Sequence, residues 1–201
     1  MRIPRGEGVG VTYVVIWTAA RILFGILFSI RVEGLEHVPA SGAAIISPNH
    51  RTAWDPPVVS TLLARPLRHM AKAELFPTLG FVLRRVGSYP VRRQAVDMHA
   101  IRHSLTLLKA GRLICIFPEG TRSRSGTLGE AKSGAARLSL QTGAPVIPVG
   151  ISGHYGFRQR VTFRFGPPVT LCDDDQDGQR IMAAIAALIS SDPRGQAPGL
   201  I

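Results

Sequence analysis

Short apolar runs alternate with amphipathic segments along most of the chain. Segments of strand length lie at 43–46, 67–71, 88–91, 113–117, 146–149 and 161–165, of which 43–46 is a continuous apolar run and 67–71 is a weaker strand pattern. Segments with helical periodicity lie between or after them, at 56–64, 74–85, 94–110, 131–142 and 180–190. Runs of this length are typical of strands buried on both faces. Their alternation with helices predicts an α/β fold with a largely parallel central sheet flanked by helices.

The N-terminal segment follows a different pattern. Residues 9–30 form an apolar run of twenty-two residues that carries one charge, Arg21, and is long enough to cross a bilayer. A charge near the middle of a span costs roughly 2.5–3.5 kcal/mol, and Gly25 weakens a helix. We therefore expect an N-terminal membrane-associated helix, embedded or interfacial, with Tyr13 and Trp17 at the interface. A spanning helix and a buried helix of a soluble domain are the alternatives.

These patterns divide the chain into three parts. Residues 1–31 are expected to form the membrane anchor or interfacial helix, 32–192 the α/β domain, and 193–201 a C-terminal tail. A chain of 201 residues is the usual size of one domain with a substantial core.

Charge and cysteine content narrow the function class. The chain has 24 Lys and Arg against 13 Asp and Glu, and between 38 and 172 the balance is 18 to 5. Such a surface attracts nucleic acid, anionic lipid headgroups or a phosphorylated substrate. Aromatic residues make up only 6% and no nucleic-acid-binding motif occurs, which argues against nucleic acid. Cys115 and Cys172 lie 57 positions apart without metal-ligand spacing, which excludes a disulfide scaffold and a structural zinc site.

The loop after the first core strand carries a candidate general base. It reads PNHRTAWD over 48–55, so His50 precedes Asp55 by five positions. A neutral imidazole takes a proton from an alcohol when a carboxylate fixes its tautomer. The two side chains meet if His50 lies in the turn before a helix and Asp55 is its N-cap, a placement that Pro56 at the first helical position favours. The alternative is a plain N-cap beside a solvent-facing histidine.

The loop that begins at Phe117 is a candidate anion site. It reads FPEGTRSRSG over 117–126. Glycine and hydroxyl residues around two arginines suit an oxyanion such as phosphate. Glu119 fits such a site if it holds an arginine or accepts a hydrogen bond from a substrate hydroxyl. The alternative is a mobile polar loop.

Together these two loops resemble the first and third signature blocks of the glycerolipid acyltransferase family, whose bacterial members include the 1-acylglycerol-3-phosphate acyltransferases. His50 and Asp55 match the H-x4-D block, and 117–122 match the F-P-E-G-T-R block. GSYPVRR at 87–93 resembles the second block, although Arg92 stands where an acid is common.

Two further matches lie downstream and extend the resemblance over roughly 34–166. VIPVG at 146–150 resembles the fourth, proline-centred block, and Lys132 with Gly134 resembles the K-x-G that opens the intervening helix.

The resemblance implies a glycerolipid-acyltransferase fold for 32–192 and an acyl-transfer reaction. A fatty acyl group would pass from acyl-CoA or acyl carrier protein to the free hydroxyl of 1-acylglycerol 3-phosphate, giving phosphatidate, with no cofactor and no metal. His50 would deprotonate the hydroxyl and Asp55 would orient His50. The residues implied in substrate binding are Arg93, Glu119, Gly120, Thr121, Arg122 and Lys132. No serine or cysteine nucleophile is needed, and no G-x-S-x-G motif occurs.

The expected partners are therefore an acyl thioester, a lysophosphatidate-like acceptor and anionic membrane lipids, without nucleic acid. The expected location is the cytoplasmic face of the cell membrane. Two alternatives stay open. The same chemistry would serve glycerol 3-phosphate, a lysophospholipid or a glycolipid hydroxyl as acceptor, and a non-catalytic membrane-binding protein would keep the fold and the charge.

Overall fold

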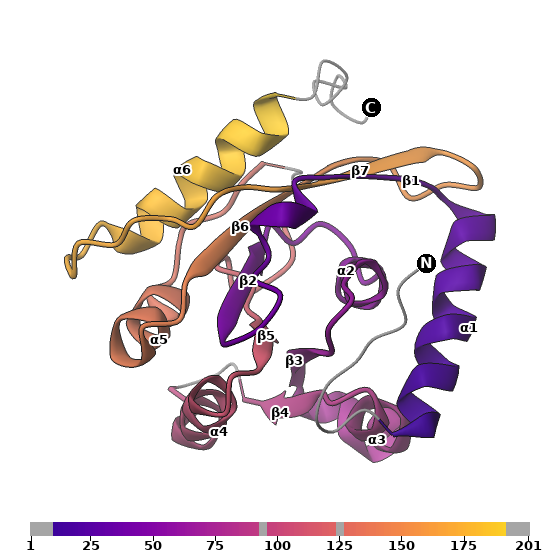
Figure 1. Cartoon of the computed structure of the whole chain (residues 1–201), viewed down its shortest axis with the longest axis horizontal. Helices are drawn as coiled ribbons and strands as arrows, with labels where there is room; N and C mark the ends of the chain where they lie inside the picture. Colours follow the sequence, from indigo (N-terminus) through magenta and orange to yellow (C-terminus); the bar gives the residue numbers. More distant parts are fainter. Residues whose placement is uncertain (1–9, 93–95, 124–126, 192–201) are drawn as a thin grey trace.

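The computed structural model describes residues 10–92, 96–123 and 127–191. Its centre is a seven-stranded sheet in the order β1-β7-β6-β2-β5-β3-β4 (Figure 1). The strands are β1 (Ser29–Glu33), β2 (Ala44–Pro48), β3 (Leu67–Lys72), β4 (Tyr89–Val91), β5 (Leu113–Cys115), β6 (Val146–Gly153) and β7 (Arg160–Phe165). All neighbouring pairs are parallel except β6 and β7, which form an antiparallel hairpin. The predicted α/β class with a largely parallel sheet is confirmed.

Helices cover both faces of this sheet. They are α1 (Val11–Leu27), α2 (Asp55–Leu62), α3 (Phe76–Arg85), α4 (Met98–Lys109), α5 (Gly134–Thr142) and α6 (Asp177–Ser190). Figure 1 shows α1, α2 and α3 on one side of the sheet and α4, α5 and α6 on the other. Two 3-10 turns, Leu35–His37 and Ala73–Leu75, complete the described elements.

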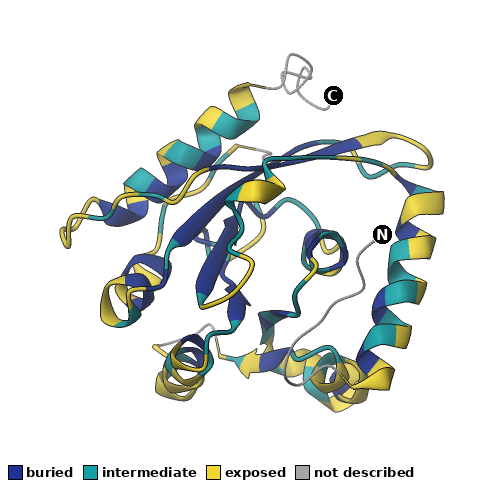
Figure 2. Cartoon of the chain, viewed as in Figure 1, coloured by how far each residue is buried: buried dark blue, intermediate teal, exposed yellow. Residues whose placement is uncertain are grey.

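The continuous apolar strands are explained by this layering, because successive residues of a strand face opposite sides of the sheet. In β2, Ile46 packs into the core shared with α1 and α2, whereas Ile45 packs against α5 and α6. In β5, Leu113 and Cys115 face the first core and Ile114 faces the second. Figure 2 shows these central strands as the buried part of the molecule.

The N-terminal apolar run is not one helix. Helix α1 ends at Leu27, and β1 follows and pairs in parallel with β7. The expected boundary at residue 31 therefore falls inside a strand of the sheet. Among the described residues, no helix combines the length and the apolar character needed to cross a membrane.

The expectation that Tyr13 and Trp17 lie at the membrane interface was also wrong. Tyr13 and Trp17 are buried at 4% exposure, and the Trp17 indole donates to the Ser60 carbonyl oxygen of α2 at 3.0 Å. Arg21 donates to the Thr61 carbonyl oxygen, so its charge is directed toward α2. The large apolar side chains that α1 exposes are instead Val11, Val15, Ile22, Leu23 and Ile26.

Several helix starts also differ from their sequence patterns. The helix expected over 74–85 begins at Phe76, so Pro77 lies in its first turn, where proline is tolerated, and does not interrupt it. The helix expected from 94 begins at Met98 because the Asp97 carboxylate accepts from the backbone N–H groups of His99 and Ala100. Residues 94 and 95, like the expected tail at 193–201, lie outside the described residues.

Candidate active site

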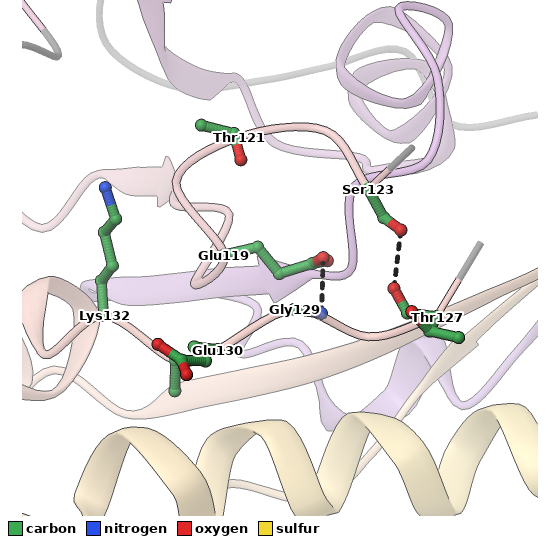
Figure 3. Close-up of a pocket in the computed structure, with 8 residues that line it drawn as sticks. Glu119, Thr121, Ser123, Thr127, Gly129, Glu130 and Lys132 are labelled. Atoms are coloured by element: carbon green, nitrogen blue, oxygen red, sulfur yellow. Dashed lines mark hydrogen bonds between the residues drawn. The ribbon is translucent and has the colours of Figure 1, made fainter. Parts of the chain in front are cut away.

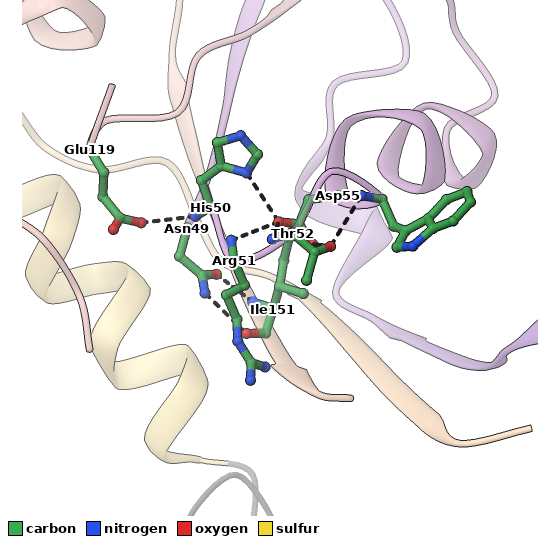
Figure 4. Close-up of polar contacts among 8 residues, drawn as sticks. Asn49, His50, Arg51, Thr52, Asp55, Glu119 and Ile151 are labelled. Atoms are coloured by element: carbon green, nitrogen blue, oxygen red, sulfur yellow. Dashed lines mark hydrogen bonds and ion pairs between the residues drawn. The ribbon is translucent and has the colours of Figure 1, made fainter. Parts of the chain in front are cut away.

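The two residues of the H-x4-D block lie in contact (Figure 4). His50 follows β2, Asp55 is the first residue of α2, and His50 Nδ1 lies 3.1 Å from Asp55 Oδ2. An ionised carboxylate only accepts hydrogen bonds, so Nδ1 carries the proton and Nε2 is the unprotonated nitrogen. No described group hydrogen-bonds to Nε2, which leaves this nitrogen available to a substrate.

The turn before α2 fixes the Asp55 carboxylate. Its Oδ2 atom also accepts from the backbone N–H groups of Arg51 at 2.7 Å and Thr52 at 2.6 Å, and Oδ1 accepts from the Thr52 hydroxyl at 3.2 Å. The expectation that Asp55 is the N-cap was wrong, because Trp54 takes that position and Asp55 is already helical. The carboxylate thus holds the turn that carries His50, and Asp55 is fully buried.

Two further residues position His50, and sequence reasoning missed both. The imidazole stacks on the Phe117 ring with centroids 4.1 Å apart and planes at 27°. The Asn49 side chain pairs with the backbone of Ile151 in β6, accepting from its N–H at 2.7 Å and donating to its carbonyl at 3.1 Å. Two sequence features could have pointed to these residues. Asn49 directly precedes His50, and Phe117 is the first residue of the F-P-E-G-T-R block.

Glu119 joins the catalytic turn to the candidate anion loop. Its Oε1 atom accepts from the His50 backbone N–H at 2.8 Å, and Oε2 accepts from the Gly129 N–H at 3.0 Å. The side chain is buried at 7% exposure. These two bonds give Glu119 a positioning role, and because the residue also lines the neighbouring pocket, its predicted contact with a substrate hydroxyl stays a prediction. Ser123 adds a second link by donating its N–H to the His50 carbonyl oxygen at 2.9 Å.

An open pocket of about 520 Å³ lies between this loop and residues 127–132 (Figure 3). Its lining combines two carboxylates, one ammonium group and three hydroxyls: Glu119, Thr121, Ser123, Thr127, Gly129, Glu130, Ala131 and Lys132. His50 is not part of the lining. The Ser123 hydroxyl donates to the Thr127 carbonyl oxygen at 2.6 Å and closes one side of the pocket.

The structure brings some of the predicted substrate-binding residues together. Thr121 and Lys132 line the pocket, and the Lys132 side chain passes so close to Gly120 that a Cβ atom there would lie 2.8 Å from it. Gly120 has φ +69°, a left-handed conformation that favours glycine. Arg122 is exposed in the same loop, and Arg93 lies outside the described residues.

Other ionisable groups near the pair are kept neutral. Burial lowers the pKa of His69 to about 4, and its Nε2 atom lies 2.5 Å from the Ser60 hydroxyl. Burial and then the Asp55 charge raise the pKa of the Cys115 thiol. The same two causes raise the pKa of Tyr155, whose buried hydroxyl lies near Asp55 but has no partner at hydrogen-bonding geometry among the described residues. Within the described residues, no group of three His, Cys, Asp or Glu side chains could hold a metal ion.

Comparison with known proteins assigns the segment that carries this geometry to a family. The sequence model of the Acyltransferase family matches residues 29–152, a segment that contains His50, Asp55 and the whole loop at 117–123. The chain belongs to the Acyltransferase family.

Two relatives of the chain are both named 1-acyl-sn-glycerol-3-phosphate acyltransferases. The chain is 32% identical over 133 residues to the chloroplast 1-acyl-sn-glycerol-3-phosphate acyltransferase LPAT1 of Arabidopsis thaliana, covering 63% of this chain and 36% of that protein. It is 35% identical over 122 residues to the 1-acyl-sn-glycerol-3-phosphate acyltransferase of Borreliella burgdorferi, covering 59% and 49%. The chain thus spans about a third to a half of the length of these two relatives.

A solved structure confirms the fold. The 1-acyl-sn-glycerophosphate acyltransferase PlsC from Thermotoga maritima matches with a TM-score of 0.73 at 21% identity, over 90% of this chain and 80% of that one. At this identity the likeness concerns the arrangement of the sheet and helices.

Proposed function

We propose that this protein transfers a fatty acyl group from acyl-CoA or acyl carrier protein to the free hydroxyl of 1-acylglycerol 3-phosphate, giving phosphatidate. The observation that carries the proposal is the buried His50 and Asp55 pair with its available Nε2 atom, in a member of the Acyltransferase family. The activity for which the relatives are named supports this choice of acceptor.

The proposed reaction is one direct displacement. His50 Nε2 takes the proton from the acceptor hydroxyl while its oxygen attacks the thioester carbonyl carbon. The tetrahedral intermediate then expels the thiolate, the carbon–sulfur bond breaks, and the proton on Nε2 passes to the sulfur. Asp55 stabilises the transient imidazolium through Nδ1, and the Phe117 stack keeps the ring oriented.

A covalent acyl-enzyme would need a nucleophile paired with the base, and among the described residues no hydroxyl or thiol hydrogen-bonds to His50 Nε2. A cysteine is a good nucleophile only as the thiolate. Burial together with the Asp55 charge raises the pKa of the Cys115 thiol and keeps it protonated. Cys115 also lies inside β5 and packs into the core with Leu113.

The acceptor phosphate is expected to bind where the F-P-E-G-T-R loop presents positive charge. Arg122 is exposed at the end of this loop. The next residue, Ser123, donates its N–H to the His50 carbonyl oxygen. The Lys132 side chain, from the segment before α5, lies against Gly120 of this loop. A guanidinium and an ammonium group here would hold a phosphate close to the base.

The protein is expected to work on the cytoplasmic face of the cell membrane. The exposed aliphatic side chains of α1 continue into α3, where Leu75, Leu79, Phe81 and Val82 are exposed in and before the helix. The two helices are joined by a hydrogen bond from Arg85 to the Thr12 hydroxyl at 3.2 Å. An apolar face with arginines at its edge is typical of proteins that bind the interface of an anionic bilayer.

Purified protein with labelled acyl-CoA and a panel of acceptors tests the proposal. The panel holds 1-acylglycerol 3-phosphate, glycerol 3-phosphate, lysophosphatidylcholine and a glycolipid, with products resolved by mass. We expect phosphatidate from the first acceptor. His50→Ala should lower its formation by 10²-fold to 10⁴-fold, roughly the usual contribution of a general base. The exposed His99 of α4 supplies the matched control, because His99→Ala should keep full activity. A His50→Ala variant with more than about a tenth of the activity would exclude His50 as the base.

A further inference from the structure

The tip of the β6–β7 hairpin carries an aromatic side chain that faces solvent. Phe157 is 76% exposed, and three basic residues, His154, Arg158 and Arg160, are exposed around it. No acidic residue occurs between 154 and 160. The active-site geometry uses none of these four side chains.

Two backbone hydrogen bonds stabilise the turn at this tip. Arg158 has φ +59°, an uncommon left-handed conformation for a non-glycine residue. Its N–H donates to the carbonyl oxygen of Leu27 at 2.7 Å, and the Gln159 N–H donates to the Gly156 carbonyl at 2.9 Å. The first bond attaches the tip to the C-terminal end of α1, as Figure 1 shows at the right-hand end of β7. The exposure of Phe157 therefore comes from an ordered turn.

The tip extends an apolar surface that begins on α1. The last two turns of α1 expose Ile22, Leu23 and Ile26, close to the end that the tip contacts. Figure 2 shows the exposed side of α1 and the exposed tip along the same edge of the molecule. Helix α3 lies at the other end of α1, so the apolar edge is at least as long as this 17-residue helix, about 25 Å.

The inner side of the same hairpin contacts the catalytic turn. Tyr155 packs against Phe28 with ring centroids 5.1 Å apart, and Phe28 packs against Trp54 at 5.9 Å. The Arg51 guanidinium donates to the Gly153 carbonyl oxygen at 2.6 Å. A surface bound by the tip therefore lies beside the loop that carries His50.

We propose that the β6–β7 tip is a second lipid-binding element, in which Phe157 enters the interface of an anionic bilayer while Arg158 and Arg160 bind lipid phosphates. Charge complementarity selects this occupant, because a basic tip without acidic residues favours anionic headgroups and an exposed aromatic ring favours the interfacial region. The inference rests on the proposed function, whose acceptor and product are both anionic lipids.

Vesicle sedimentation of the full chain tests this element. The vesicles are phosphatidylcholine alone or phosphatidylcholine mixed with phosphatidylglycerol. Phe157→Ser should weaken binding to the mixed vesicles about tenfold, the usual effect of withdrawing a large apolar side chain. Arg158→Asn, which keeps a residue that tolerates positive φ, and Arg160→Gln should each weaken it about fivefold at low salt and much less at high salt.

Matched controls come from the opposite side of the molecule. Leu140 on α5 and Arg102 on α4 are exposed, and Leu140→Ser and Arg102→Gln should leave vesicle binding unchanged. Wild-type binding by the Phe157→Ser variant would overturn the inference. A change in its sedimentation velocity without vesicles would also overturn it, because the tip would then be a contact between copies of this chain.

A second assay separates this inference from the proposed function. Turnover of a water-dispersed short-chain 1-acylglycerol 3-phosphate needs no bilayer, so all three tip variants should keep wild-type activity on it. Absence of turnover in the wild-type protein would contradict the proposed function and leave the vesicle result intact. Full turnover with unchanged vesicle binding in the three variants would contradict only the lipid-binding tip.

Discussion

Replacing Glu119 with glutamine should loosen the catalytic turn. The carboxylate accepts one backbone N–H on each oxygen, from His50 and from Gly129. Glutamine has one oxygen and one NH₂ group, so in either orientation one buried N–H faces another donor. An unsatisfied buried donor costs about 1–3 kcal/mol, and loss of the charge weakens the bond that remains. We expect Glu119→Gln to lower the free energy of unfolding by about 2–4 kcal/mol, which for a chain of this size lowers Tm by roughly 5–15 °C.

The assay compares Tm, kcat and the acceptor KM in the two proteins. Displacement of the His50 backbone should lower kcat more than it raises KM, because the base is then misplaced for the attack. Glu130 lines the same pocket and is exposed, so Glu130→Gln is the matched control and should change neither Tm nor kcat. The reasoning fails if Glu119→Gln keeps Tm within about 2 °C and raises only the acceptor KM. Glu119 would then bind the acceptor.

Three further predictions concern groups that are buried near the pair. Cys115→Ala should keep most of the activity, and an acyl group trapped on either cysteine sulfur would contradict this expectation. The folded pKa of His69 is about 4 against about 6.5 when unfolded, so the unfolded state binds an extra proton between these values and stability falls with decreasing pH. Between pH 7 and pH 4, the free energy of unfolding measured in urea should fall by about 3 kcal/mol more for the wild-type protein than for His69→Gln. Equal decreases would show that His69 is not buried in its neutral form. Tyr155→Phe should leave the free energy of unfolding unchanged or higher, because it removes a buried hydroxyl that has no hydrogen-bond partner in the described part of the chain. A loss above about 1 kcal/mol in the same urea assay would instead show a hydrogen bond to Asp55.

The sheet was predictable because its central strands are buried on both faces. An apolar run of only five residues such as 113–117 is too short for a typical helix, so it indicates a strand, and β5 forms over Leu113–Cys115 of it. The N-terminal run was not predictable to the residue. A continuous apolar run does not distinguish helix from strand by periodicity, so nothing within 9–30 marked the change from α1 to β1. Which side of α1 faces the protein depends on α2, more than forty positions away from Trp17.

In the active site, too, contacts within one turn were predictable from the sequence and contacts between distant segments were not. His50 and Asp55 lie five positions apart in one turn, so local spacing was enough to predict that they meet. The partners of Glu119 lie in two other segments, and a loop sequence does not tell which backbone N–H groups will approach its carboxylate. The residue type predicted a polar contact, and the tertiary structure determined which one.

Helix α1 belongs to the core as well as to the proposed membrane surface, and this limits how anchoring can be separated from catalysis. Tyr13, Trp17 and Phe24 are each 4% exposed, and truncation of a buried aromatic residue costs about 3–5 kcal/mol. Removing all three with the helix would cost roughly 10 kcal/mol, which is comparable to the whole stability of an ordinary domain. A chain without α1 would also uncover α2, whose first residue is Asp55. Loss of activity after such a deletion would therefore reflect a damaged site, whereas substitution of exposed residues such as Ile26 alters the surface and leaves the core of the helix intact.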